Sequence, residues 1–198
     1  LMAKHGPALL ELAAANDAQL MFEASVGGGI PVLTPLRTCL RANRIQRIIG
    51  IVNGTTNYIL TQMKDTGRDF SLILKDAQDK GFAEANPTND IEGYDAAYKT
   101  VVLVSTGFGK RIEFSQVYCE GITKIALRDI EDAQELGYAI KLLSISEDRP
   151  EGVVARVHPT LVPLSHPLSG IHGVLNAVYV EGKPIGPLMF LGRGAGPD

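Results

Sequence analysis

The sequence predicts an α+β fold in which helices cover one side of a largely antiparallel or mixed β-sheet. Two observations lead to this prediction. Apolar residues recur at helical spacing in several segments before residue 144, and extended, β-rich segments follow one another after it. With 198 residues, 45% of them hydrophobic, the chain can form one large domain, or one domain plus fragments of another.

The first half of the chain alternates between helical and extended patterns. A helix is predicted for Pro7–Asn16, because proline is tolerated at the first helical position, where its missing N–H is not needed. Strands are predicted for Gln19–Val26 and for Arg44–Val52, which is rich in β-branched residues. A helix follows each strand, over Ile30–Ala42 and over Thr55–Lys64.

The second half contains three more predicted helices and the remaining strands. Ser71 can cap the first of these helices and Gly81 can end it. The three helices are Leu72–Lys80, Tyr94–Thr106 and Asp129–Leu143. The predicted strands are Lys141–Ser146, Val153–Pro163, Gly173–Glu181 and Pro187–Leu191, with Pro163–Gly170 as a connection.

Composition excludes several classes of function. The net charge is −3 and acidic and basic residues are mixed along the chain, which does not suggest binding to nucleic acid or to an anionic membrane. No apolar run approaches the ~20 residues that span a bilayer. Cys39 and Cys119 form no CxxC pair, so we expect two small buried side chains in a reducing, cytoplasmic protein. No histidine has metal-ligand spacing; the histidines are His5, His158, His166 and His172.

The most informative stretch is G-F-A-E-A-N-P-T-N-D-I-E-G-Y-D-A-A-Y-K, from Gly81 to Lys99. Glu84 and Asp90 lie in a Pro/Asn-rich segment that is typical of a loop, and Asp95 and Lys99 are four residues apart, so they share one face of a helix. Carboxylates can bind an ammonium group, and a lysine can give a proton to an oxygen that gains charge. The alternative is a solvated acidic loop followed by a surface ion pair worth about 0.3–0.5 kcal/mol. The apolar neighbours of Lys99 on this helix argue against that alternative.

Three glycine-containing turns are weaker motifs. The stretch E-A-S-V-G-G-G-I-P (Glu23–Pro31) can bring backbone groups close to an ion or a cofactor, but the pattern alone favours a tight connection between a strand and a helix. It is not the G-x-G-x-x-G fingerprint of dinucleotide-binding proteins. N-G-T-T-N-Y (Asn53–Tyr58) can offer free N–H groups to a carboxylate, and the pattern alone favours plain N-capping by Asn53 or Thr55. G-R-G-A-G (Gly192–Gly196) resembles a strand-to-helix phosphate site.

Taken in order, these motifs resemble homoserine dehydrogenase, a family of NAD(P)-dependent oxidoreductases. The matching stretches are E-A-S-V-G-G-G-I-P, G-I-V-N-G-T-T-N-Y-I-L, A-E-A-N-P-T-N-D-I-E-G-Y-D-A-A-Y-K and G-R-G-A-G-P-D, and they cover nearly the whole chain. The resemblance implies interconversion of L-homoserine and L-aspartate 4-semialdehyde, on the route to threonine, methionine and isoleucine. It also implies a substrate-binding fold like the C-terminal domain of glyceraldehyde-3-phosphate dehydrogenase.

The resemblance implies a role for each site residue. Lys99 would be the catalytic proton donor, Glu84 would bind the ammonium group of the amino acid, and Asp90 and Asp95 would line the same pocket. Gly54 and Thr55 would position the substrate, and Gly196 would approach the NAD or NADP cofactor. A monovalent cation, usually sodium, would be held by the side chain of Glu23 and by backbone carbonyls. These carbonyls belong to Val26, Gly28 and Ile30.

The resemblance also implies how the chain is organised. Residues 1–22 would be a remnant of a nucleotide-binding domain, residues 23–186 the catalytic and dimerisation domain, and residues 187–198 a segment returning to the nucleotide-binding domain. A homodimer is expected. Phe82 stands where the family usually has tyrosine, and Asn86 where it usually has aspartate, so substrate affinity can differ.

Two other functions stay open at this stage. The chain can be a binding and dimerisation fragment without turnover, since both ends look cut from inside a longer protein and no G-x-G-x-x-G turn precedes the motifs. It can also be a different amino-acid-binding or semialdehyde-using enzyme on a similar scaffold.

Overall fold

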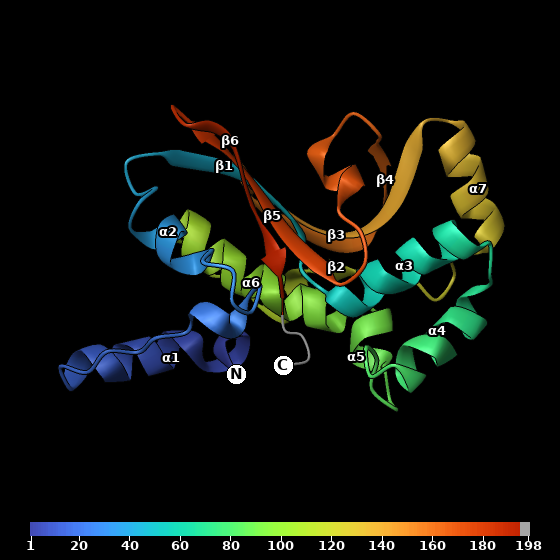
Figure 1. Ribbon diagram of the computed structural model, residues 1–198. Coiled ribbons are helices and arrows are strands. Elements are labelled where there is room, and N and C mark those ends of the chain that lie inside the picture. Colours follow the sequence, from blue (N-terminus) through green and yellow to red (C-terminus); the bar gives the residue numbers. More distant parts are fainter. Residues whose placement is uncertain (195–198) are drawn as a thin grey trace.

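A mixed six-stranded sheet forms the centre of the computed structural model, which describes residues 1–194 (Figure 1). Its order is β2-β4-β3-β1-β5-β6. The neighbouring strands are antiparallel except β2 and β4, which run parallel. The strands are β1 (Arg44–Ile51), β2 (Tyr118–Cys119), β3 (Tyr138–Arg149), β4 (Gly152–Pro163), β5 (Leu175–Lys183) and β6 (Gly186–Arg193).

The main helices lie on one side of this sheet, as the sequence predicted. Figure 1 shows α6 crossing beneath the strands, with α2 and α3 beside it and α1 farther from the sheet. The α-helices are α1 (Met2–Ala15), α2 (Leu33–Arg37), α3 (Gly54–Thr66), α4 (Phe70–Asp79), α5 (Thr88–Ile91), α6 (Tyr94–Phe108) and α7 (Leu127–Glu135). Short 3-10 turns are η1 (Glu23–Ser25), η2 (Phe114–Gln116) and η3 (Pro167–Gly170). No helix among residues 1–194 is long and apolar enough to cross a membrane.

Apolar side chains are buried on both faces of the sheet. The larger cluster lies between sheet and helices and includes Ile48 on β1 and Leu103 on α6, both fully buried. Ile49, the neighbour of Ile48, belongs to a second cluster that also contains Leu168 of η3. Side chains alternate between the faces of a strand, so adjacent isoleucines can serve two different cores. Truncating a buried side chain of this size to alanine costs about 2–5 kcal/mol.

Two predicted elements in the first half are wrong. The predicted strand Gln19–Val26 is irregular and contains the turn η1, because the Glu23 side chain bonds to the start of α2. The predicted helix Ile30–Ala42 shrinks to Leu33–Arg37. Beyond Thr38 the chain leaves the helix through consecutive turns, in which the amide of Asn43 donates to the carbonyl of Leu40.

Two elements in the second half are also corrected. The predicted helix Asp129–Leu143 begins at Leu127 and ends at Glu135, and Tyr138 already belongs to β3. Gly137 separates them with a φ of 81°, a conformation that favours glycine. Ala139–Leu143 is a nearly continuous apolar run, which fits the end of a buried helix as well as a buried strand, and this explains the error. The helix α4 starts after Asp69, so Ser71 is not its cap.

Other differences are smaller. Helix α1 starts at Met2, so Pro7 lies inside it, not at its first position. Cys39 is exposed, against the expectation that it is buried. Cys119 is half-buried, and burial raises the pKa of its thiol. Neither α5 nor β2 was predicted, since each is very short.

Candidate functional site

A cavity of about 590 Å³ lies where α3, α5 and α6 begin. Seven of the residues to which the family resemblance assigns a role line it, and they come from four segments. They are Gly28, Gly54, Thr55, Glu84, Asp90, Asp95 and Lys99. The remaining walls are Ala24, Gly27, Asn53, Gly81, Phe82, Ala83, Val174 and Asn176. Residues far apart in the sequence therefore meet around one hollow.

The turn from β1 into α3 forms one wall of the cavity. Asn53 has an extended backbone, and its Oδ1 accepts a hydrogen bond from the amide of Thr56 at 2.9 Å, so Asn53 is the N-cap of α3. This capping places Gly54 and Thr55 at the helix start, where backbone N–H groups have no helical acceptor. A Cβ on Gly54 would lie 3.0 Å from the carbonyl oxygen of Val174, so a glycine lets the two walls come close together.

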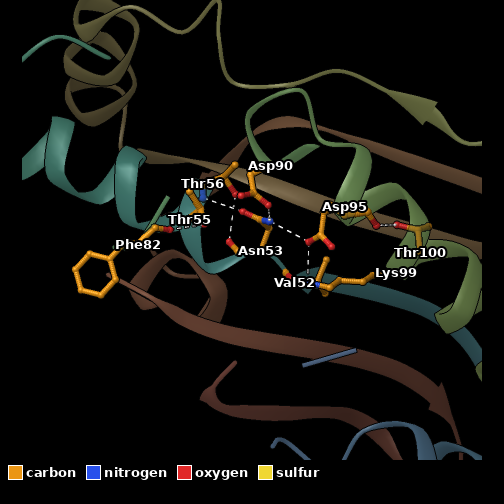
Figure 2. A network of polar contacts seen from close by, with 10 residues as sticks. Val52, Asn53, Thr55, Thr56, Phe82, Asp90, Asp95, Lys99 and Thr100 are labelled. Carbon is orange, nitrogen blue, oxygen red and sulfur yellow. Dashed lines mark hydrogen bonds and ion pairs between the residues drawn. The ribbon is translucent and has the colours of Figure 1, made fainter. Parts of the chain in front are cut away.

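Asn53 also joins two of the acidic residues, as Figure 2 shows. Its Nδ2 donates to Oδ1 of Asp90 at 2.7 Å and to Oδ2 of Asp95 at 2.9 Å. The sequence motif indicated Asn53 as a cap, and its second role was missed. An asparagine that caps a helix with its oxygen still has an NH₂ group to offer, and this was the feature that could have indicated it.

Lys99 is fixed in the cavity wall by two acceptors. Its Nζ donates to Oδ2 of Asp95 at 2.7 Å and to the carbonyl oxygen of Val52 at 2.8 Å (Figure 2). The Lys99 side chain is 25% exposed and that of Asp95 is 32% exposed. The pair is therefore partly buried beside the cavity and is not a free surface ion pair. An ammonium group has three N–H donors, so one remains for a ligand after these two contacts within residues 1–194.

The acidic residues give the cavity a negative potential. Burial raises the pKa of the Asp90 carboxyl above its ordinary value, and the nearby charges of Asp95 and Glu84 raise it further. The hydrogen bond from Asn53 and the charge of Lys99 oppose this shift without cancelling it. Three carboxylates around one ammonium group leave an excess of negative charge, which attracts a second cation.

The loop that carries Glu84 is fastened to two helices. The hydroxyl of Thr55 donates to the carbonyl oxygen of Phe82 at 2.8 Å, and Nε2 of Gln78 donates to the carbonyl oxygen of Glu84 at 3.0 Å. The Phe82 ring packs against Tyr58, with ring centroids 4.7 Å apart. Glu84 itself is exposed at the rim of the cavity. Its backbone is thus held in place while its carboxylate stays accessible to a ligand.

Glu23 binds the start of α2. Its Oε1 accepts from the amides of Val32 at 2.6 Å and Leu33 at 2.7 Å, and its Oε2 accepts from the amide of Thr34 at 2.7 Å and from the Thr34 hydroxyl. Partial burial raises the pKa of the Glu23 carboxyl, but these hydrogen bonds outweigh burial, and the pKa lies below its ordinary value. Each oxygen already accepts two hydrogen bonds, so the carboxylate has little capacity left for a cation.

The other residues implied for cation or cofactor binding are placed differently. Gly28 lines the cavity, while Val26 and Ile30 are buried in the main core. Among residues 1–194, no group of three or more His, Cys, Asp and Glu side chains could hold a metal ion. Gly196 lies outside the described residues. The nearby Gly194 lies close to the site, because a Cβ there would clash with Oδ1 of Asn176.

Comparisons with known proteins show the family to which the chain belongs. Residues 31–198 match the family model described as homoserine dehydrogenase. A homoserine dehydrogenase of Synechocystis sp. is 48% identical over 200 residues, covering 99% of this chain and 46% of the relative. The crystal structure of a homoserine dehydrogenase from Thiobacillus denitrificans superposes with a TM-score of 0.96 at 46% identity, covering 99% of this chain and 46% of the other.

A more distant structure carries a cofactor. It is a hyperthermophilic archaeal homoserine dehydrogenase mutant in complex with NADPH, with a TM-score of 0.83 and 29% identity, and the match covers 98% of this chain and 56% of that one. The chain thus spans about half the length of the relatives it matches.

Proposed function

This chain belongs to the homoserine dehydrogenase family, and we propose that it forms the part of such an enzyme that binds the amino acid and transfers the proton. The reaction is the interconversion of L-homoserine and L-aspartate 4-semialdehyde. The observation that supports it most is that Asn53 and Lys99 gather Asp90 and Asp95 at one cavity.

The three polar groups of L-homoserine suit three parts of the cavity. Its ammonium group fits the carboxylates of Glu84 and Asp90, which leave the cavity negative. Its carboxylate fits the start of α3, where Gly54 and Thr55 offer backbone N–H groups at the positive end of the helix dipole. Its side-chain oxygen then faces Lys99. These roles are our assignments.

Lys99 is the proposed proton donor in the direction that forms homoserine. The hydride that reduces the aldehyde carbon would come from a bound nicotinamide cofactor. The carbonyl oxygen gains negative charge, and the remaining N–H of Lys99 gives it a proton, which produces the alcohol. Asp95 holds Nζ in place with a 2.7 Å contact. In the reverse direction Lys99 accepts the proton.

The cavity suits a nicotinamide cofactor, NAD or NADP. Gly27, Gly28 and Gly81 lie in its walls and allow a flat ring to approach the backbone closely. We propose that the segment that contains Gly196 contacts the cofactor, because a Cβ on Gly194 would clash with the side chain of Asn176 in the cavity wall. We also propose that residues 1–22 and 187–198 adjoin a nucleotide-binding domain, and that residues 23–186 form the catalytic and dimerisation domain.

Only some of the residues that the family resemblance implies for a sodium ion suit that ion. Carbonyl oxygens of Val26, Gly28 and Ile30 are hard ligands of the kind that sodium prefers. The Glu23 carboxylate does not fit a ligand role, since both of its oxygens are committed to Val32, Leu33 and Thr34. We therefore retain a cation near the turn as a proposal without Glu23 as a side-chain ligand. A cytoplasmic homodimer is likewise proposed from the family.

Turnover and binding assays test this function together. In the full-length protein, L-homoserine and NADP⁺ or NAD⁺ should give an increase in absorbance from the reduced cofactor. The 198-residue chain alone should bind L-homoserine, measured by titration calorimetry, without turning it over. This result is the one expected of a binding and dimerisation fragment. L-2-aminobutyrate, which lacks the hydroxyl, should bind more weakly. Absence of a response to homoserine in both assays would favour a different amino-acid enzyme.

A further inference from the structure

Lys141 on β3 is a buried lysine that the proposed proton transfer does not use. Its exposed fraction is 3%. Nζ donates to Oδ1 of Asn57 on α3 at 3.1 Å and to the carbonyl oxygen of Ile171, which follows η3. Burying a charged group is unfavourable unless hydrogen bonds compensate for the lost water. A buried lysine is therefore expected to have a role that an apolar side chain at the same position could not serve.

The partner of Lys141, Asn57, continues the same set of hydrogen bonds. Asn57 is 2% exposed, and its Nδ2 donates to the carbonyl oxygens of Gly173 at 3.0 Å and Leu175 at 3.2 Å. One turn later on α3, the hydroxyl of Thr61 accepts from the amide of Gly173 at 3.1 Å. Lys141, Asn57 and Thr61 thus fasten the segment 171–175 to α3.

This segment is a wall of the candidate site. Val174 lines the cavity, and its carbonyl oxygen lies 3.0 Å from the position that a Cβ would take on Gly54. Gly54 begins the helix α3 that also carries Asn57. The contacts of Lys141 therefore fix two facing parts of the cavity, the helix start and the segment that packs on it.

The charged surroundings of Lys141 come from α3 and from the fastened segment. Burial and, to a smaller extent, the charge of Lys64 lower the pKa of Lys141 to about 8, while the charge of Asp65 opposes the change. His172 lies in the fastened segment, and burial together with the charges of Lys141 and Lys64 lowers its pKa. The two groups that accept hydrogen bonds from the Lys141 ammonium, Oδ1 of Asn57 and the carbonyl oxygen of Ile171, are both uncharged.

We propose that Lys141 is a positioning residue for the substrate pocket, because it ties the Ile171 carbonyl to Asn57 and so sets the place of Val174 against the start of α3. The identity of the ligand rests on the proposed function. The network itself rests on hydrogen bonds among residues outside the set that touches the substrate, so it can be tested separately.

Hydrogen exchange and homoserine binding of the 198-residue chain test the proposal. Lys141→Met keeps the length of the side chain and removes its charge and donors. Lys110→Met is the matched control, since Lys110 pairs with Asp148 on the surface at the other end of β3. In Lys141→Met, we expect amide exchange of residues 171–176 to accelerate about tenfold or more, with exchange in β1 unchanged. Because the hydrogen bonds of Lys141 are lost, the Kd for L-homoserine should also rise about fivefold or more.

Each outcome decides between positioning and plain packing. Unchanged exchange of residues 171–176, equal acceleration in β1, or an unchanged Kd in Lys141→Met would overturn the proposal. If that variant does not fold, Thr61→Val removes the acceptor of the Gly173 amide and should show the same local acceleration, to a smaller extent. If the unsubstituted chain binds no L-homoserine, the proposed function fails, and the exchange of residues 171–176 then decides the positioning role.

Discussion

The ammonium nitrogen of Lys99 lies 2.7 Å from Oδ2 of Asp95, one turn earlier on α6, and the same oxygen accepts from Asn53 at 2.9 Å. One carboxylate oxygen therefore fixes both a charged donor and an amide. Because Asn53 also holds Asp90 and caps α3, the positions of three segments depend on one another. The proposed chemistry depends on this shared oxygen.

The first prediction concerns the proton donor. In the full-length protein, Lys99→Ala should lower kcat by about 100-fold or more, the low end for general acid catalysis, and should change KM less. Lys110→Ala, on an exposed lysine, is the matched control and should leave kcat unchanged. A kcat for Lys99→Ala within a few-fold of the unsubstituted enzyme would refute the role.

The second prediction concerns binding of the ammonium group. Glu84→Gln should raise KM for L-homoserine about tenfold or more, because it removes one charge-assisted hydrogen bond. Glu84 is exposed, so the fold should be unaffected. Glu151→Gln, in the exposed turn between β3 and β4, serves as the control. An unchanged KM in a folded Glu84→Gln enzyme would count against the assignment.

The third prediction uses the acidic cluster around Asn53. Asn53→Asp keeps the capping oxygen and replaces two donors by a third carboxylate next to Asp90 and Asp95. At pH 7.5 this should reduce the free energy of unfolding by about 1–3 kcal/mol, the cost of leaving buried polar groups unpaired.

The pH dependence of this effect has a defined sign. In the variant, the added negative charge raises the pKa of Asp90 further above its value in the unfolded state, so the folded state binds more protons. The stability lost in the variant should therefore be regained as the pH falls toward the carboxyl pKa values of the unfolded state. The pKa of Asp90, which burial raises, implies the same trend for the unsubstituted chain. Urea unfolding at pH 7.5 and pH 5 measures the difference. A deficit that stays constant or grows on acidification contradicts the model of clustered charge.

The fourth prediction separates two roles of Glu23. Glu23→Gln replaces one accepting oxygen by a donor that faces the backbone amides of α2, so stability should fall by about 1–3 kcal/mol. The loss should be equal in sodium chloride and in choline chloride, since the carboxylate is occupied by amides. Thermal unfolding in both salts provides the measurement, and a loss confined to sodium would instead assign Glu23 as a cation ligand.

The fifth prediction concerns the stability of the chain in alkaline solution. The pKa of Lys141 is lowered to about 8 by burial, against an ordinary value near 10.5, so the unfolded state binds more protons between these values. The stability of the unsubstituted chain relative to Lys141→Met should therefore increase as the pH rises from 7.5 to 9.5, by about 2 kcal/mol. Urea unfolding of both proteins at the two pH values tests this, and parallel curves would contradict it.

Sequence reasoning identified the parts of the site that have local spacing. Asp95 and Lys99 are four residues apart, which is enough to place them on one face of a helix. The strands predicted in the β-rich last part of the chain likewise have their centres close to those of β3 to β6. Contacts over long distances in the chain were missed. Asn53 meets Asp90 and Asp95 through tertiary folding, and no local pattern contains that information.

The largest errors in the predicted elements have two sources, a side chain that overrides the preference of the backbone and a glycine that ends a helix. Residues 19–26 have a strand-like composition, but the Glu23 carboxylate gains several hydrogen bonds by bending back to Val32 and Leu33. Gly137 separates a helix from a strand where one helix was predicted, because the nearly continuous apolar run after this glycine fits either element. Lys141 was read as one end of a strand, and its burial depends on Ile171, thirty residues away.

A crystal structure of the chain with bound L-homoserine would show whether the substrate lies against Lys99 as proposed. We expect the ligand in the cavity, with its hydroxyl oxygen about 3 Å from Nζ of Lys99, its ammonium group facing Glu84 and Asp90, and its carboxylate at the amides of Gly54 and Thr55. A ligand whose hydroxyl points away from Lys99, or which occupies another part of the molecule, would contradict it.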